Sequence, residues 1–336
     1  MNSLERVQKR LRGETVDRVP NFNIMMTFAA HFIQQPLRRY YLEYRTLVEA
    51  NLAVMDAFEL DIVQAISDPY REASDLGAAV EFPEDGLPIC KQPLLTEEVD
   101  FRRMKRVDPA AGRRMSDRLD AVRLFKERVG DQAPVMGWVE GALAEAADLR
   151  GVGALLEDLP GAPAWLDELL ERCAEVEIAF ARAQIAAGAD MIGLGDAVAS
   201  QISARMYRRF GLPYEQRIFT AVHEMGALAR LHICGNTTRL LADMALSGAD
   251  IIDVDWMVDL GRAAEVFYEQ AAVCGNMDPV AVMLRGNPAQ VAEVVQANLA
   301  QGGARMISAA GCEIPDGTPH ANLRAHARVL KTGSQL

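Results

Sequence analysis

Residues 230–254 read RLHICGNTTRLLADMALSGADIIDV, and this stretch predicts one strand–helix–strand unit. A β-branched, apolar run stands at each end, and a segment of helical period lies between the two runs. Asn236 or Thr237 can cap this helix at its start, and Gly248 suits a left-handed stop at its end. Strands that alternate with helices in this way are typical of a parallel sheet.

The same alternation extends along the chain and predicts eight strands, each followed by helical sequence. We therefore expect an α/β fold, a (β/α)8 TIM-type barrel that forms a single domain over residues 1–336. The residues before the first strand predict an N-terminal helical extension laid against the barrel. The expected strands are Val19–Ile24, Asp61–Ile66, Pro134–Val139, Asp190–Leu194, Arg230–Cys234, Asp250–Val254, Ala271–Cys274 and Arg305–Ala309.

The connection between the second and third strands, residues 68–133, is longer than one crossover needs and predicts an insertion after strand 2. Its turn-rich part, EFPEDGLPICK at residues 81–91, is expected to form a lid or an extra hairpin over the barrel mouth. A helical pattern over residues 162–187 places Cys173 on an apolar stripe, where packing is its expected role.

Composition excludes several classes of function. No apolar run approaches the roughly 18 residues that span a bilayer, so no membrane segment is expected. A formal net charge of −12 argues against nucleic-acid binding. The five cysteines are scattered, which favours free thiols or metal ligands in a reducing compartment, and the expected location is the cytoplasm. A homodimer is the default expectation for assembly.

Active sites of these barrels lie at the carboxyl ends of the strands. Polar residues gather just past the predicted strands, and this set is the candidate site. It comprises Ser67, Asp68, Arg71, Glu140, Asp196, His232, Cys234, Asp255, Asn276, Asp278 and Cys312.

A metal site is the most specific of the candidates. His232 and Cys234 are two apart on a predicted strand, so both side chains point to the same face. Cys312 follows the last strand and reaches the same mouth when the barrel closes. One histidine and two cysteines match open catalytic zinc sites. The alternative is a hydrogen-bonded core histidine with two cysteines that act as small apolar residues, and spacing alone leaves both interpretations open.

Five segments of the chain resemble the uroporphyrinogen decarboxylase-like superfamily, and specifically its corrinoid-dependent methyltransferase branch. They are DPYREASDLGA (68–78), GWVEGALAEAADLRG (137–151), LHICGNT (231–237), CGNMDP (274–279) and SAAGCEIPDGTPHANLRA (308–325). The resemblance implies that His232, Cys234 and Cys312 hold one zinc ion per chain. It also implies methyl transfer between a corrinoid and a small substrate such as a thiol, a methoxy compound or a methylamine.

The chain has no D-x-H-x-x-G pattern of the kind that binds a corrinoid. Cobalamin is therefore expected on a partner corrinoid protein. Decarboxylases of the superfamily resemble one another in an Arg-Gln-Ala-Gly-Arg-Tyr stretch, whereas the corresponding region here reads FNIMMTFAAHFIQ, residues 22–34. A metal-free decarboxylase of the uroporphyrinogen type and a non-catalytic corrinoid-binding partner stay as the alternatives.

The remaining candidates are assigned by position. Glu140 is expected to accept a proton, orient His232 or complete the zinc ligands, with placement at a helix start as the alternative. Asp196 and Asp255 are judged similarly, and one of these named acids is expected to orient the imidazole. Arg71, Asn276 and Met25 are the candidate substrate-binding residues, although capping and core packing would also explain Asn276 and Met25.

Overall fold

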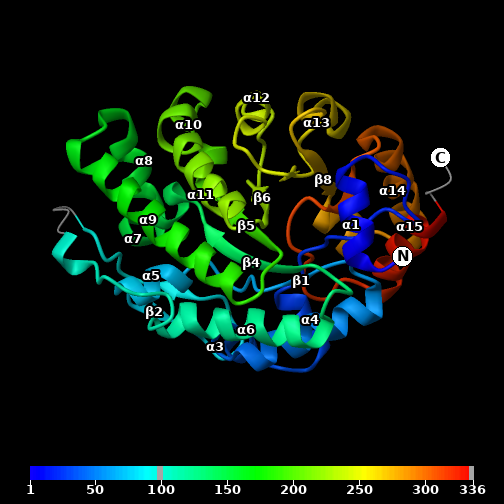
Figure 1. Cartoon of the computed structure of the whole chain (residues 1–336), viewed down its shortest axis with the longest axis horizontal. Helices are drawn as coiled ribbons and strands as arrows, with labels where there is room; N and C mark the ends of the chain where they lie inside the picture. The colour runs from blue at the N-terminus through cyan, green and yellow to red at the C-terminus, as the bar shows by residue number, and fades with distance from the viewer. Residues whose placement is uncertain (97–100, 333–336) are drawn as a thin grey trace.

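The computed structural model describes residues 1–96 and 101–332, so residues 97–100 of the predicted insertion and the last four residues lie outside it. Seven parallel strands form one curved sheet in the order β1-β4-β5-β6-β7-β8-β9. Helices cover the outer side of this sheet (Figure 1). The strands are β1 (Val63–Gln64), β4 (Val135–Glu140), β5 (Met191–Gly195), β6 (Leu228–His232), β7 (Ile251–Asp253), β8 (Ala272–Met277) and β9 (Ile307–Ala310).

The helices connect these strands and account for most of the remaining chain. Over the described residues the α-helices are α1 (Ser3–Leu11), α2 (Thr27–Phe32), α3 (Leu37–Leu42), α4 (Tyr44–Phe58), α5 (Arg71–Leu76), α6 (Arg113–Val129), α7 (Ala142–Arg150), α8 (Val152–Gly161), α9 (Ala164–Ala186), α10 (Ala204–Phe210), α11 (Leu212–Glu224), α12 (Leu241–Met244), α13 (Leu260–Phe267), α14 (Pro288–Gly302) and α15 (His320–Thr332). Shorter turns of other helix types are η1 (Phe101–Arg103), η2 (Ala197–Gln201) and η3 (Pro279–Leu284).

The TIM-type fold is confirmed, but the first predicted strand is not a strand in the structure. Within residues 19–24, pairing is limited to a single parallel bridge between Asn21 and Ser308 of β9. The segment still fills the place between β9 and β1, because the Asp61 amide donates to the Asn21 carbonyl at 2.9 Å. Side chains replace the missing ladder: the Asn23 Oδ1 accepts from the Ala310 amide at 2.8 Å, and its Nδ2 lies 3.0 Å from His326 Nδ1.

Two apolar layers follow from the alternation of side chains along each strand. One face points into the barrel, where Met136, Trp138 and Met191 pack with residues of the other strands. The opposite face, which includes Ile192 and Leu194, packs against the helices. This alternation decides which strand-end residues reach the barrel mouth.

The long insertion contains a hairpin, as expected for its turn-rich segment. Strand β2 (Val80–Glu81) pairs antiparallel with β3 (Ile89–Cys90). Helix α9 confirms the predicted long helix, and Cys173 is fully buried in its apolar stripe. The helix predicted between residues 236 and 248 is much shorter than expected, because only α12 is regular there.

The N-terminal helix α1 covers the end of the barrel opposite the site. The Leu4 amide donates to the carbonyl of Gln132 before β4, and Arg10 donates to the carbonyls of Gly303 and Met306 before β9. The predicted N-terminal extension is therefore present. Among the described residues, no helix is long and apolar enough to cross a membrane.

Candidate functional site

The three predicted metal ligands converge at the carboxyl end of the sheet. One donor atom from each of His232, Cys234 and Cys312 lies within 4.8 Å of the other two. The Cys312 Sγ is 3.9 Å from His232 Nε2. His232 is the last residue of β6, so Cys234 lies in the following loop and not on the strand as predicted. The convergence that the spacing predicted is nevertheless present.

An aspartate on the neighbouring strand fixes the orientation of the imidazole. Asp253, the last residue of β7, is paired in register with His232, and its Oδ2 lies 2.8 Å from His232 Nδ1. Its Oδ1 accepts from Arg230 Nε at 2.9 Å. Burial alone would raise the pKa of Asp253, but Arg230 and His232 outweigh it and lower that pKa to about 2. An ionised Asp253 accepts from Nδ1–H, so Nε2 is the ring nitrogen that faces Cys312.

Asp255, a predicted site residue, holds the loop backbone. Its Oδ2 accepts from the Gly235 amide at 2.6 Å, and its Oδ1 accepts from the Trp256 amide at 2.7 Å. Gly235 follows the predicted ligand Cys234, so Asp255 ties the two mouth loops after β6 and β7 together. A Cβ on Gly311 would lie 2.5 Å from the Trp256 nitrogen, so only glycine lets the loop that carries Cys312 approach this closely.

His232, Cys234 and Cys312 form the predicted metal-ligand cluster. A cavity of about 160 Å³ opens beside this cluster. Five of the predicted residues line it: Asp68, Arg71, Glu140, His232 and Cys312. The remaining lining residues are Ile24, Met26, Ile66, Pro69, Trp138, Gly195, Ala197 and Glu313. Trp138 forms a wall of the cavity close to His232. The centroids of the two rings are 6.2 Å apart.

Two ion pairs lie at this cavity, and they involve two of its acids, Glu140 and Asp68. Arg71 Nη2 lies 2.7 Å from Glu140 Oε1, and Arg71 is fully buried. Arg114 Nη2 lies 2.5 Å from Asp68 Oδ2. Burial and the nearby Glu72 raise the pKa of Glu140 to about 7, against the opposing effect of Arg71. Glu140 can therefore bind or release a proton near neutral pH.

The structure places Asp196 and Met25, two predicted site residues, outside the cavity lining. Asp196 follows β5 on the outward face that Ile192 and Leu194 share, and it is fully buried toward the helices. Met25 packs in the outer core, whereas its neighbour Met26 lines the cavity. The alternation of side chains along β5 could have assigned Asp196 to the outer face. The segment around Met25 is irregular, so no periodic pattern in the sequence could have shown which way Met25 points.

Asn276 also serves the backbone rather than the cavity. Its Nδ2 donates to the carbonyls of Val258 at 2.7 Å and Asp255 at 3.2 Å. Asp278 caps the following helical turn, since its Oδ1 accepts from the Val280 and Ala281 amides. Both residues shape the loops around the mouth without lining the cavity.

A buried acidic group behind Glu140 was missed from the sequence. Glu72, Glu145 and Glu177 are fully buried on α5, α7 and α9. The carboxyl oxygens of Glu145 have no hydrogen-bond partner among the described residues. Burial and the surrounding acids raise the pKa of Glu145 and of Glu177 well above the ordinary value. Their helical positions read as ordinary surface acids, so no sequence signal could have found them.

Comparison with known proteins agrees with this architecture. The family model described as uroporphyrinogen decarboxylase (URO-D) matches residues 2–332. The methylcobamide:CoM methyltransferase MtbA of Methanosarcina acetivorans is 30% identical over 341 residues, which cover 97% of each chain. The uroporphyrinogen decarboxylase of Nostoc punctiforme is 31% identical over 284 residues, which cover 80% of this chain and 79% of that protein.

Among solved structures, a methyltransferase from Methanosarcina mazei has a TM-score of 0.90 at 24% identity and covers 99% of both chains. This likeness shows the shared fold. The family match extends over nearly all of the chain and confirms the resemblance carried by its motifs. The chain belongs to the uroporphyrinogen decarboxylase family.

Proposed function

We propose that this protein is a zinc-dependent methyltransferase that moves a methyl group between a corrinoid protein and a small substrate, with a thiol as the first candidate. The observation that carries the proposal is the convergence of His232, Cys234 and Cys312 beside a small cavity. Methoxy compounds and methylamines are the other substrate classes to be tested.

The donor set fits zinc. Zinc–ligand bonds of about 2.0–2.3 Å place tetrahedral donor atoms about 3.3–3.8 Å apart. The 3.9 Å between His232 Nε2 and Cys312 Sγ is close to this separation, and Cys234 lies within 4.8 Å of both donors. Three protein ligands leave one position for substrate, and a zinc ion held there would supply positive charge that lowers the pKa of a bound thiol.

The size and charge of the cavity support a small substrate. Its volume of about 160 Å³ is below the roughly 300–1,000 Å³ of pockets for drug-sized ligands. Its one lining cation, Arg71, is already paired with Glu140. A porphyrinogen is a large macrocycle with several carboxylates, and the described lining residues offer no unpaired cation for it.

Glu140 and Arg71 have complementary roles in this proposal. Glu140 accepts the proton that a thiol releases, since its pKa of about 7 suits proton uptake near neutrality. Arg71 fixes the Glu140 carboxylate through the 2.7 Å ion pair. Asp253 holds His232 in the tautomer that presents Nε2.

The corrinoid is assigned to a partner because the chain has no corrinoid-binding signature of its own. The relative from Methanosarcina acetivorans is named for methylcobamide and CoM, and CoM is a thiol. This name supports both a corrinoid-bound methyl group and a thiol substrate here.

The test combines metal content with turnover. We expect about one zinc per chain, and Cys234→Ser and Cys312→Ser variants should lose it, whereas Cys90→Ser, a half-buried cysteine outside the cluster, should keep it. Spectroscopy should show conversion of methylcobalamin to cob(I)alamin when coenzyme M is added to the zinc-loaded enzyme. Decarboxylation of uroporphyrinogen by the metal-free protein would refute the proposal, as would full activity of the two cysteine variants.

A further inference from the structure

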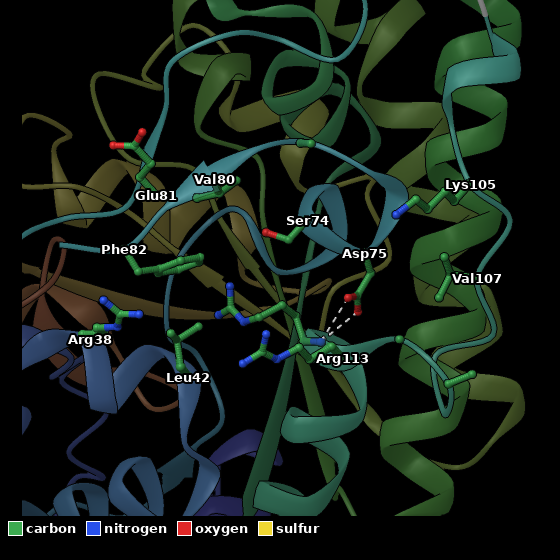
Figure 2. Close-up of a pocket in the computed structure, with 14 residues that line it drawn as sticks. Arg38, Leu42, Ser74, Asp75, Val80, Glu81, Phe82, Lys105, Val107 and Arg113 are labelled. Atoms are coloured by element: carbon green, nitrogen blue, oxygen red, sulfur yellow. Dashed lines mark hydrogen bonds between the residues drawn. The ribbon is translucent and has the colours of Figure 1, made fainter. Parts of the chain in front are cut away.

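A second pocket lies at the rim of the barrel mouth, apart from the metal-ligand cluster. It has a volume of about 800 Å³ and lies between α3, the β2–β3 hairpin and the start of α6. Figure 2 shows Arg38, Lys105 and Arg113 reaching this hollow from different parts of the chain. The proposed function makes no use of this pocket.

Three cations of the pocket have no carboxylate partner among residues 1–96 and 101–332. The side chains of Arg38, Lys105 and Arg113 are exposed, and none forms an ion pair with a described residue. The fourth cation, Arg114, is buried and paired with Asp68. Such a concentration is unusual in a chain with a formal net charge of −12. A concave surface lined by one sign of charge concentrates ligands of the opposite sign.

The acids of the pocket do not neutralise these cations. Both carboxylate oxygens of Asp75 accept from backbone amides at the start of α6, those of Arg114 and Met115, at 2.8–3.1 Å. Glu81 is paired with Lys91 at 2.7 Å. The remaining charges of the lining are the three positive charges of Arg38, Lys105 and Arg113 and the one negative charge of Asp75. The lining therefore has an excess of about two positive charges.

The pocket is lined by apolar side chains in addition to the cations. Phe82 is half-buried, and Arg114 lies over its ring at 4.7 Å from the centroid. Leu42, Val80 and Val107 complete the apolar lining, as Figure 2 shows. A volume of about 800 Å³ is within the range of small-molecule sites and exceeds what a bare inorganic anion needs.

We propose that this rim pocket binds a phosphate ester with an apolar or aromatic body, of the size of a mononucleotide. Arginine side chains match the geometry of phosphate oxygens, and a phosphate monoester carries the two negative charges that balance the lining. A free nucleotide offers such a monoester, and the nucleotide part of a corrinoid offers a phosphate diester with one negative charge on a similar organic body, so both are sources to be distinguished.

Calorimetric titration of the full-length protein with AMP, adenosine and inorganic phosphate tests the proposal. AMP should bind at least about tenfold more tightly than adenosine or phosphate, because the pocket recognises both the phosphate and the organic part. Binding should weaken as salt is raised, since the three cations are exposed to solvent. Failure of AMP to bind at millimolar concentration at low salt would overturn the proposal.

Variants locate the binding. Arg38→Gln and Arg113→Gln should each weaken AMP binding about tenfold or more, whereas Arg123→Gln, an exposed arginine of α6 that does not line the pocket, should leave it unchanged. Arg114 is kept because it also holds Asp68 at the neighbouring cavity. Equal AMP affinity in Arg113→Gln and Arg123→Gln would place the ligand elsewhere and refute the site.

Competition identifies the source of the phosphate ester. If a corrinoid is the natural occupant, cobalamin should displace AMP, whereas cobinamide, which lacks the nucleotide, should not. If a free nucleotide is the natural occupant, neither cobalamin nor cobinamide should displace AMP. Both outcomes support the pocket. Displacement of AMP by cobinamide as effectively as by cobalamin would contradict recognition of the nucleotide part. Loss of zinc in Cys312→Ser should leave AMP binding intact, so failure of the proposed function is distinguishable from failure of this proposal.

Discussion

Asp253 Oδ2 lies 2.8 Å from His232 Nδ1, and this contact directs the opposite ring nitrogen toward Cys312. The two residues end neighbouring strands in register, so the sheet itself sets their separation. Carboxylate partners of metal-binding histidines fix the tautomer and raise ligand basicity. The barrel therefore supplies an oriented donor before any metal binds.

Replacing Asp253 with asparagine should weaken zinc binding about 10- to 100-fold, because the imidazole loses its anionic partner. Competition with a chromophoric chelator measures this affinity. The variant also leaves Arg230 buried without a counter-charge, which lowers stability. Arg230→Gln is the matched control, since it keeps the contact between Asp253 and His232. An equal loss of zinc affinity in both variants would show that general destabilisation is the cause.

Glu140→Gln should reduce kcat for methyl transfer to a thiol about 100-fold or more and leave zinc content unchanged. The amide preserves the size of the side chain and removes its ability to accept a proton. Stopped-flow spectroscopy of methylcobalamin, together with metal analysis, separates the two effects. The loss of kcat in Glu140→Gln should be smaller at high pH, where the substrate is supplied as a preformed thiolate and no proton has to be removed. A variant with normal kcat at pH 7 would eliminate Glu140 as the proton acceptor.

Glu145→Gln should stabilise the protein at alkaline pH. The folded state raises the pKa of Glu145, so unfolding releases a proton and stability falls as pH rises above the ordinary value of 4.5. Each unit of pKa shift corresponds to about 1.4 kcal/mol, so the variant should gain more than about 1 kcal/mol at pH 8 and little at pH 4. Urea denaturation at both pH values measures the difference. Glu175→Gln, an exposed glutamate on α9, is the control, and an equal gain in both variants would contradict the expectation.

Asn23→Ala should lower the free energy of unfolding by about 2–3 kcal/mol. The substitution leaves the buried Ala310 amide and His326 Nδ1 without a partner where the segment 19–24 closes the barrel. Chemical denaturation measures the change. Asn298→Ala, which removes one 3.5 Å contact, should cost far less. Similar losses for the two variants would show that Asn23 has no special part in closure.

The sequence alone predicted the class of the fold and the candidate metal donors. Strand β6 and its neighbours are short, mostly apolar runs, and such local patterns do not depend on distant contacts. The positions of His232 and Cys312 at strand ends then place them at one mouth, because parallel strands all end on the same side. The expectation held for Cys234 even though it lies just beyond its strand.

Tertiary structure alone decided which other polar residues lie together. Asp253 and Asp255 share a strand face in the sequence, but the strand ends at Asp253, and only there does register bring a carboxylate beside His232. The segment 19–24 has the composition of a strand, yet Asn23 completes the closure through its side chain. Strand register, the paths of the loops and the packing of helices on the sheet arise from contacts between residues far apart in sequence. The local periodicity of the sequence therefore cannot predict them.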